Sequence, residues 1–211
     1  LLLVALGLFI RSRLVGANAG IIIESEPSST VLIDGAQVGA TPVTLNRKPG
    51  EVLVKLLPFS QTDGFAPYET KVVLTSGVYT VVRRLFGSTD ESSSGDILSF
   101  EKIGGRNASL SVVSSPDAAQ IELDGKNVGF TPQKIDSVES GDHILRVFSP
   151  DYAVRELPIK AVTGYRLTAV VKLASDKKSE DSVQETTPEA ELKKTLVEIL
   201  TTPTGFLRVR E

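Results

Sequence analysis

Short runs of alternating residues recur along most of this chain and predict β-strands. In residues 31–34, and again in 121–124, the first and third side chains are apolar and the run ends in aspartate. The runs 52–56 and 143–147 repeat this period of two, with valine, leucine or histidine at every second position. Because successive side chains of a strand point to opposite faces, this period predicts half-buried strands.

The chain also carries the same order of turn residues twice. An Asp-Gly pair, a Val-Gly pair and a Thr-Pro pair occupy residues 34–42 and return in residues 124–132, displaced by 90 positions. A glycine followed by an acidic residue comes next in both copies. Self-similarity at so long a period indicates two copies of a small domain and not a solenoid. The repeated positions are Asp34, Gly35, Gly39, Thr41, Pro42 and Gly50, and then Asp124, Gly125, Gly129, Thr131, Pro132 and Gly141.

These turn residues predict how the strands connect. Asp tolerates a left-handed backbone and Gly adopts it without steric penalty, so each Asp-Gly pair predicts a hairpin turn. Thr-Pro predicts a strand start or a sheet edge, because proline cannot donate to a central ladder. Each copy closes with a further hairpin, over residues 69–85 and 155–173. Six or seven short strands in about 65 residues predict a small β-sandwich.

The repeated residues resemble the PEGA domain, a small β-module of bacterial and archaeal envelope proteins. The resemblance rests on the Asp-Gly strand end, the Val-Gly-x-Thr-Pro step and the following Gly-acid turn, in residues 34–51 and again in 124–143. It implies an all-β fold with two tandem β-sandwich domains, over residues 20–87 and 108–174. The family has no shared catalytic site, so the resemblance implies no particular reaction.

Residues 1–19 are expected to be a truncated, helical membrane anchor or a signal segment. Leu1–Ile10 is apolar, but a membrane span needs about twenty residues, so an anchor requires residues before Leu1. Ala17–Ala19 resembles a signal-peptide cleavage site. Arg11 and Arg13 count against cleavage. In an anchor they would lie on the outer flank, where the positive-inside rule disfavours positive charges. A buried segment is the third interpretation; the first two place the repeats outside the cytoplasm.

The last part of the chain is expected to be a spacer followed by the start of another domain. Residues 175–195 are polar and charged, and cannot bury enough apolar surface to fold. Residues 196–211 resemble the opening of a bacterial Src-homology-3-like domain, in which a Thr-Gly-aromatic-Leu-x-Val-Arg stretch starts a β-barrel. The resemblance implies cell-wall binding. A stray terminal hairpin is the alternative interpretation.

Residues 88–107 are expected to link the two domains. The first half of this segment is rich in Ser, Asp and Glu and is expected to be a loop. Residues 97–103 alternate, and we expect them to pair with a sheet edge and to limit motion between the domains.

The candidate chemistry is sparse. His143 is the only histidine, and at the head of a strand it is expected to have a structural role. Asp34 and Asp124 could serve a calcium site or acid-base catalysis, but both precede a turn glycine, which explains them fully. The chain has no cysteine, so thiolate chemistry is excluded. No catalytic, metal-binding or cofactor-binding residue is therefore predicted.

Four aromatic residues lie near the predicted corner loops. They are expected to pack into the core or to cap the corners, and a carbohydrate-stacking surface is the alternative. The four are Phe65, Tyr68, Phe148 and Tyr152.

Together these features predict a non-enzymatic, single-pass membrane protein with extracytoplasmic domains. The tandem modules would act as a stalk that presents a wall-binding domain, with peptidoglycan, another envelope polymer or envelope proteins as partners. A net charge of −3 argues against nucleic-acid binding, which requires a concentrated basic patch. The alternative is an envelope enzyme, such as a wall hydrolase, with its catalytic domain beyond residue 211.

Overall fold

The computed structural model describes residues 18–59 and 64–176, and within these ranges the chain consists of strands and loops. The first repeat contains β1 (Ala19–Glu26), β2 (Ser29–Ile33), β3 (Ala36–Ala40), β4 (Val43–Arg47), β5 (Gly50–Pro58), β6 (Tyr68–Leu74) and β7 (Tyr79–Leu85). One further strand, β8 (Ser94–Lys102), follows. The second repeat contains β9 (Ala108–Ser115), β10 (Gln120–Leu123), β11 (Lys126–Phe130), β12 (Gln133–Val138), β13 (Gly141–Phe148), β14 (Arg155–Ala161) and β15 (Tyr165–Lys172).

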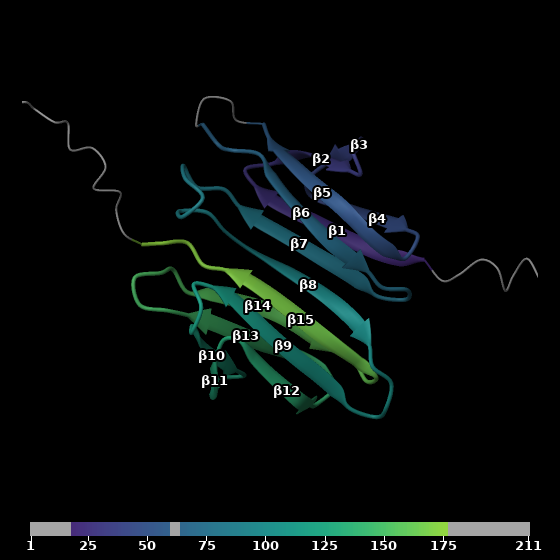
Figure 1. The fold of residues 1–211 in the computed structure, drawn as a ribbon, viewed down its shortest axis with the longest axis vertical. Helices are drawn as coiled ribbons and strands as arrows, with labels where there is room; N and C mark the ends of the chain where they lie inside the picture. The colour runs from purple at the N-terminus through teal and green to yellow at the C-terminus, as the bar shows by residue number, and fades with distance from the viewer. Residues whose placement is uncertain (1–17, 60–63, 177–211) are drawn as a thin grey trace, which may run out of the picture. The chain divides into compact units, whose positions relative to one another are not determined.

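The prediction of an all-β fold built from two tandem β-sandwich domains is confirmed. Each repeat has a four-stranded sheet, in the order β3-β2-β5-β6 in the first and β11-β10-β13-β14 in the second. The remaining strands form one seven-stranded sheet in the order β12-β9-β15-β8-β7-β1-β4, which Figure 1 shows side by side.

Three expected segments lie wholly or mostly outside the described residues. They are the helical anchor or signal segment in residues 1–19, the spacer in residues 175–195 and the start of a β-barrel in residues 196–211. Where the structure does describe the chain, it contains no helix with the length and apolar character that crossing a bilayer requires.

Each predicted Asp-Gly turn is present with a left-handed backbone. The φ angles are 51° and 80° at Asp34 and Gly35, and 51° and 75° at Asp124 and Gly125. Two successive positive φ angles match the right-handed twist of the flanking strands. The aspartate adds a tie to the next strand, because its Oδ1 accepts the N–H of Leu53 in the first repeat, at 2.9 Å, and that of Ile144 in the second, at 2.9 Å.

The Thr-Pro step places a buried hydroxyl between two strands. The Thr41 hydroxyl accepts the N–H of Ser29 at 2.8 Å and lies 2.7 Å from the Ser25 hydroxyl. The threonine of the second copy does the same with Ala119 N–H, at 3.0 Å, and with the Ser114 hydroxyl, at 2.6 Å. A buried hydroxyl is costly unless it is hydrogen-bonded, so this network accounts for threonine at both positions. The prolines that follow, Pro42 and Pro132, directly precede β4 and β12.

The remaining predicted turn glycines all have positive φ angles, which residues with a Cβ atom rarely adopt. They are Gly39, Gly50, Gly129 and Gly141.

The segment predicted to be a linker contains β8, and the expected pairing of its alternating residues with a sheet edge occurs on both sides. β8 is antiparallel to β7, the last strand of the first repeat, and to β15, the last strand of the second. It therefore lies in the middle of the large sheet, because both repeats end in a strand whose outer side would otherwise be unpaired.

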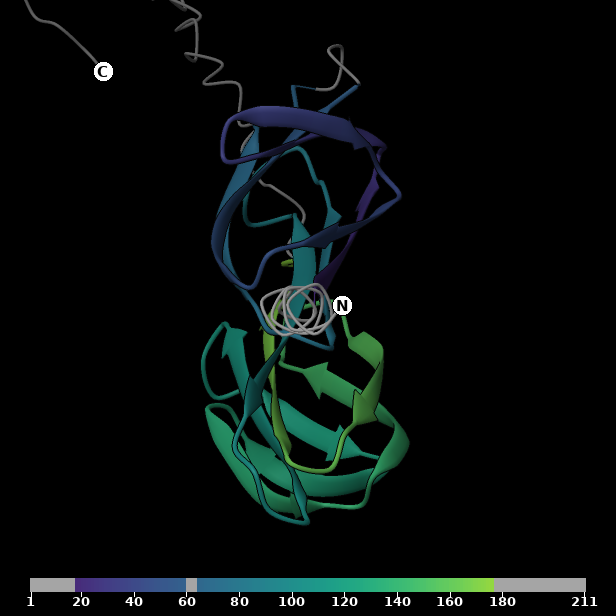
Figure 2. The same cartoon turned by 90° about the vertical axis from the view of Figure 1, so that its right-hand side faces the viewer.

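The two hydrophobic cores lie on opposite faces of the large sheet. On β7, Val82 belongs to the core of the first repeat, whereas its neighbour Val81 packs against the core of the second. On β8, Ile97 packs on the first core and Leu98 belongs to the second. Since neighbouring side chains of a strand point to opposite faces, the small sheets must cover opposite faces. Figure 2 shows the strands of each repeat curving around their own interior.

A buried carboxylate on β8 joins the two repeats. The side chain of Asp96 has no exposed surface and pairs with Arg83 of the first repeat, at 3.1 Å, and with Arg155 of the second, whose Nε lies 3.0 Å away.

A second carboxylate, on the loop before β8, also joins the repeats. Asp90 pairs with Arg84 of the first repeat, at 2.8 Å, and with Lys172 of the second. Both repeats therefore depend on charges carried by the segment between them.

We expect Asp96→Asn to destabilise both repeats together, by about 3 kcal/mol, because it leaves two arginines without their shared counter-charge. Hydrogen exchange of the amides in β1 and β9 measures the two cores separately. Glu101→Gln is the matched control on the same strand. Glu101 is exposed and, among the described residues, pairs with Arg166 alone, so its loss should cost about 0.5 kcal/mol or less. Faster exchange in one repeat alone would contradict this coupling.

Candidate functional site

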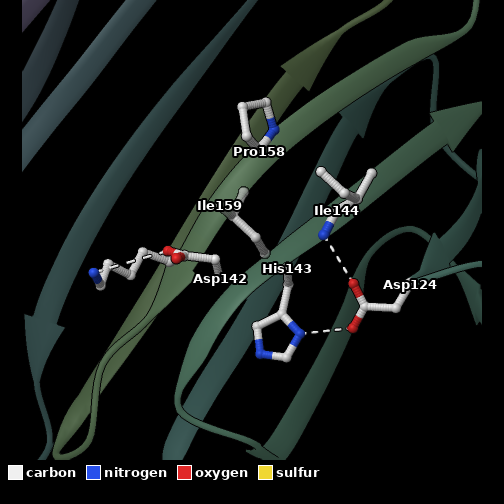
Figure 3. Close-up of a pocket in the computed structure, with 7 residues that line it drawn as sticks. Asp124, Asp142, His143, Ile144, Pro158 and Ile159 are labelled. Atoms are coloured by element: carbon white, nitrogen blue, oxygen red, sulfur yellow. Dashed lines mark hydrogen bonds and ion pairs between the residues drawn. The ribbon is translucent and has the colours of Figure 1, made fainter.

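The only histidine is held by two acceptors at the start of β13. His143 Nδ1 lies 2.7 Å from a carboxylate oxygen of Asp124, and Nε2 lies 2.7 Å from the backbone carbonyl of Glu139. The histidine side chain is 11% exposed. Figure 3 shows the imidazole turned toward Asp124, whose second oxygen accepts the Ile144 N–H. Because both ring nitrogens face acceptors, the protonated imidazolium, which donates from both, fits this position best.

This geometry shifts both partners toward their charged forms. The Asp124 carboxylate, and then the Glu139 carbonyl, raise the pKa of His143 above its ordinary value of 6.5. In turn, the hydrogen bond from His143, and then that from the Ile144 N–H, lower the pKa of Asp124 below 3.8. The ion pair is therefore complete between the lowered pKa of Asp124 and the raised pKa of His143.

His143 and Asp124 border a shallow hollow of 370 Å³ on the outer face of the small sheet. The hollow has apolar side chains at Ile144 and Pro158 and charged ones at Asp142 and Lys160, which lie 3.8 Å apart. Both ring nitrogens of His143 are engaged, one by Asp124 and the other by the Glu139 carbonyl. The arrangement serves to fix the strand start, as expected for His143.

The first repeat lacks this pair. Leu53 and Ile144 occupy matching positions, because each donates its N–H to the turn aspartate of its repeat. The residue before Leu53 is Val52, where the second repeat has His143. Asp34 therefore holds its turn through the backbone alone, and turn geometry explains both aspartates.

The four aromatic side chains do not gather into one stacking surface. Tyr68 lies under the guanidinium of Arg84, 4.5 Å from the ring centre, and Phe65 packs against Phe86 at 6.2 Å. In the second repeat, Phe148 lies under a guanidinium, at 5.2 Å, and Tyr152 packs on the core. Packing and corner capping, the first expectation, describe these contacts.

A second hollow lies where the two repeats meet. It has a volume of 380 Å³, with Tyr68 of the first repeat at one wall and apolar residues of the second repeat, including Val113 and Val170, beneath. Arg84 and Lys172 also line it. Sequence reasoning did not find this groove, because its walls come from strands that are far apart in the chain.

The residues that join the repeats were also missed. Asp96 directly precedes the alternating run 97–103. Its two arginine partners lie 13 and 59 positions away. The only available signal was a charged residue on what would otherwise be an apolar position of a strand. Among the described residues, no group of three or more His, Cys, Asp and Glu side chains is placed to hold a metal ion.

We expect His143 to make the stability of the second repeat depend on pH. A raised histidine pKa contributes its full stabilisation below the unfolded value, near 6.5, and loses it as the pH rises through the folded value. The wild type should therefore exceed His143→Asn in unfolding free energy by more at about pH 5.5 than at about pH 8.5. Urea unfolding at the two pH values measures this difference. Lys160→Gln, at the same hollow, is the control and should show no such change; an equal effect of His143→Asn at both pH values would refute the ion pair.

Comparison with known protein families matches the PEGA domain twice, over residues 8–85 and 107–174. Comparisons with curated proteins and with solved structures found no match. The two matched stretches together span more than half of the chain, and each contains one set of seven strands with the Asp-Gly and Thr-Pro steps. The chain therefore belongs to the PEGA domain family.

Proposed function

We propose that this protein is a non-enzymatic scaffold of the cell envelope. In this proposal the two PEGA domains form a rigid spacer between an N-terminal membrane anchor and a C-terminal wall-binding module. PEGA domains are extracellular β-domains, which is consistent with such a role.

The observation that carries the proposal is the direction of the strands at which the chain enters and leaves. β1 runs parallel to β7, and both β7 and β15 run antiparallel to β8, so β1 and β15 point the same way. The chain thus enters the large sheet at the start of β1, at one end, and leaves it after β15, at the other (Figure 1). Eight residues of strand separate these ends by about 25 Å. A domain that passes the chain from one end to the other suits a spacer.

Rigidity is the second requirement, and it follows from the shared sheet. Strands joined edge to edge on both sides of β8 cannot swing as two beads on a flexible linker would. The pairs of Asp96 with arginines from both repeats add a contact that is buried and therefore little screened by salt.

The outer parts of the proposal rest on the sequence. Residues 1–19 supply the anchor, and residues 196–211 supply the start of the wall-binding module. The proposed partners are the membrane and peptidoglycan, another envelope polymer or envelope proteins. A role without catalysis is supported by His143, because its two ring nitrogens are bound to Asp124 and to Glu139.

We expect the two repeats to keep a fixed separation in solution. The sequence contains no cysteine, so cysteines introduced at the exposed Lys48 and Lys126 can be spin-labelled without background. Double electron–electron resonance should then give one narrow distance distribution, unchanged in Glu101→Gln. A broad distribution in the wild type would mean independent domains and would contradict the rigid spacer.

We also expect the full-length protein to be tethered to the membrane with its repeats outside the cytoplasm. Cell fractionation followed by protease treatment of spheroplasts tests this. Membrane association with repeats that protease can reach supports the tether, whereas soluble protein, or repeats protected until lysis, contradicts it. Soluble secreted protein that begins near Gly20 would instead support a cleaved signal.

A further inference from the structure

The two small sheets end in matching edge strands, β6 in the first repeat and β14 in the second. An edge strand turns every second backbone N–H and C=O away from its sheet, where another strand can pair with them. The hydrogen bonds of the turn aspartates reveal which residues these are in each repeat.

In β6 the outward-facing residues are Glu69, Lys71 and Val73. Leu53 donates its N–H to Asp34 and accepts the Asp34 N–H, each at 2.9 Å, so its backbone turns away from β6. Its cross-strand neighbour Lys71 must then direct its own N–H and C=O to the free edge, and the residues two positions away follow. The Val73 carbonyl accepts the Thr80 hydroxyl at 3.1 Å, outside its own sheet, as this pattern requires.

In β14 the same position is occupied by proline. Ile144 exchanges both backbone hydrogen bonds with Asp124, and its cross-strand neighbour is Pro158. Proline has no N–H to offer, and its ring projects toward any strand that would pair there. The edge of the second repeat is thus blocked at its centre, whereas the first repeat has Lys71 at the matching position and leaves its edge open.

The open edge borders the groove between the repeats. β6 lies over β8, and Tyr68, the first residue of β6, forms a wall of the 380 Å³ groove. Its floor is the outer face of β9 and β15, where Val113 and Val170 are 38% and 42% exposed. A strand added beside β6 would therefore lie above these two valines.

We propose that β6 binds an extended segment of a partner polypeptide as a fifth strand of its sheet, laid in this groove. Only a polypeptide in extended form presents N–H and C=O groups at the spacing of the unpaired groups of Glu69 and Lys71. Alternate side chains of the partner face the floor and are apolar. On the outer face, Glu69 and Lys71 already pair with Lys55 and Glu51 of β5, each at 3.4 Å. A basic and an acidic residue two positions apart in the partner extend these two pairs across the new strand.

A second copy of this chain does not fit the groove. If β6 of a second copy paired with this edge, the large sheet of that copy would lie about 10 Å beneath the extended small sheet. That space is already filled by β9 and β15 of the first copy, because one continuous sheet underlies both repeats. The occupant must be a single extended layer, which a peptide segment is and a folded PEGA domain is not.

Selection of displayed random 12-residue peptides on the 211-residue chain, followed by titration of the enriched peptides, tests the proposal. Lys71→Pro, which copies Pro158, should weaken their binding roughly tenfold by removing one ladder hydrogen bond and obstructing the edge. Lys71→Ala keeps the edge and should retain most of the affinity. Binding should also slow hydrogen exchange at the amides of Glu69 and Lys71.

A second variant tests the floor without altering the edge. Val170→Asp should weaken the same peptides, and Val154→Asp, at an exposed valine outside the groove lining, should not. The proposal is overturned if no peptide distinguishes the wild type from Lys71→Pro, or if the protected amides lie elsewhere. It is equally overturned if Lys71→Pro abolishes self-association or binding to purified peptidoglycan while peptides do not bind.

Discussion

Backbone pairing on both sides of β8 is the constraint on which the rest of this structure depends. Two sandwiches of this kind could each end in an unpaired strand, and unpaired edges are liable to associate with other chains. Here a single strand from the connecting segment pairs with β7 and with β15 and turns two sheets into one. Because side chains alternate across a strand, β8 then supplies apolar residues to both cores, and the small sheets are forced to opposite faces.

The same arrangement explains why charges occur in the interior. A strand that lies between two repeats is covered on both faces, so a carboxylate on it is removed from water and needs compensation. Asp96 obtains this from one arginine of each repeat. Near the core of the first repeat, Arg84 is 5% exposed, stacks on Tyr68 and pairs with Asp90. Its counterpart by strand register in the second repeat is Val171. The repeats thus share a fold but not the composition of their interiors.

The residues that the two repeats share maintain the fold, whereas the residues that differ give each repeat its own chemical properties. Turn aspartates and Thr-Pro hydroxyls make equivalent hydrogen bonds in both copies. His143 replaces a valine and gives one repeat a titratable tie. Pro158 replaces Lys71 and closes one edge while the other stays open. One fold can thus diverge through single substitutions at its surface and edges.

The sequence by itself determined the elements and their repetition. Alternation at Val31 and Ile33 identifies a strand because burial on one face requires a period of two, and Asp34-Gly35 identifies its turn because the left-handed backbone admits few residues. Those effects are local, so a single sequence contains them. The anchor and the wall-binding module are also sequence predictions, and the structure describes neither.

Only the tertiary structure decided where β8 pairs, on which faces the cores lie and which residues compensate Asp96. These outcomes depend on hydrogen-bond partners and counter-charges from distant parts of the chain. An alternating run is equally compatible with the edge and with the centre of a sheet. Likewise, the strand register is needed to show that the backbone groups of Pro158 and Lys71 face outward. Only then is it clear that Pro158 blocks its sheet edge and that Lys71 leaves its edge open. The physical reason is that pairing and desolvation are properties of neighbours in space, which a one-dimensional pattern does not specify.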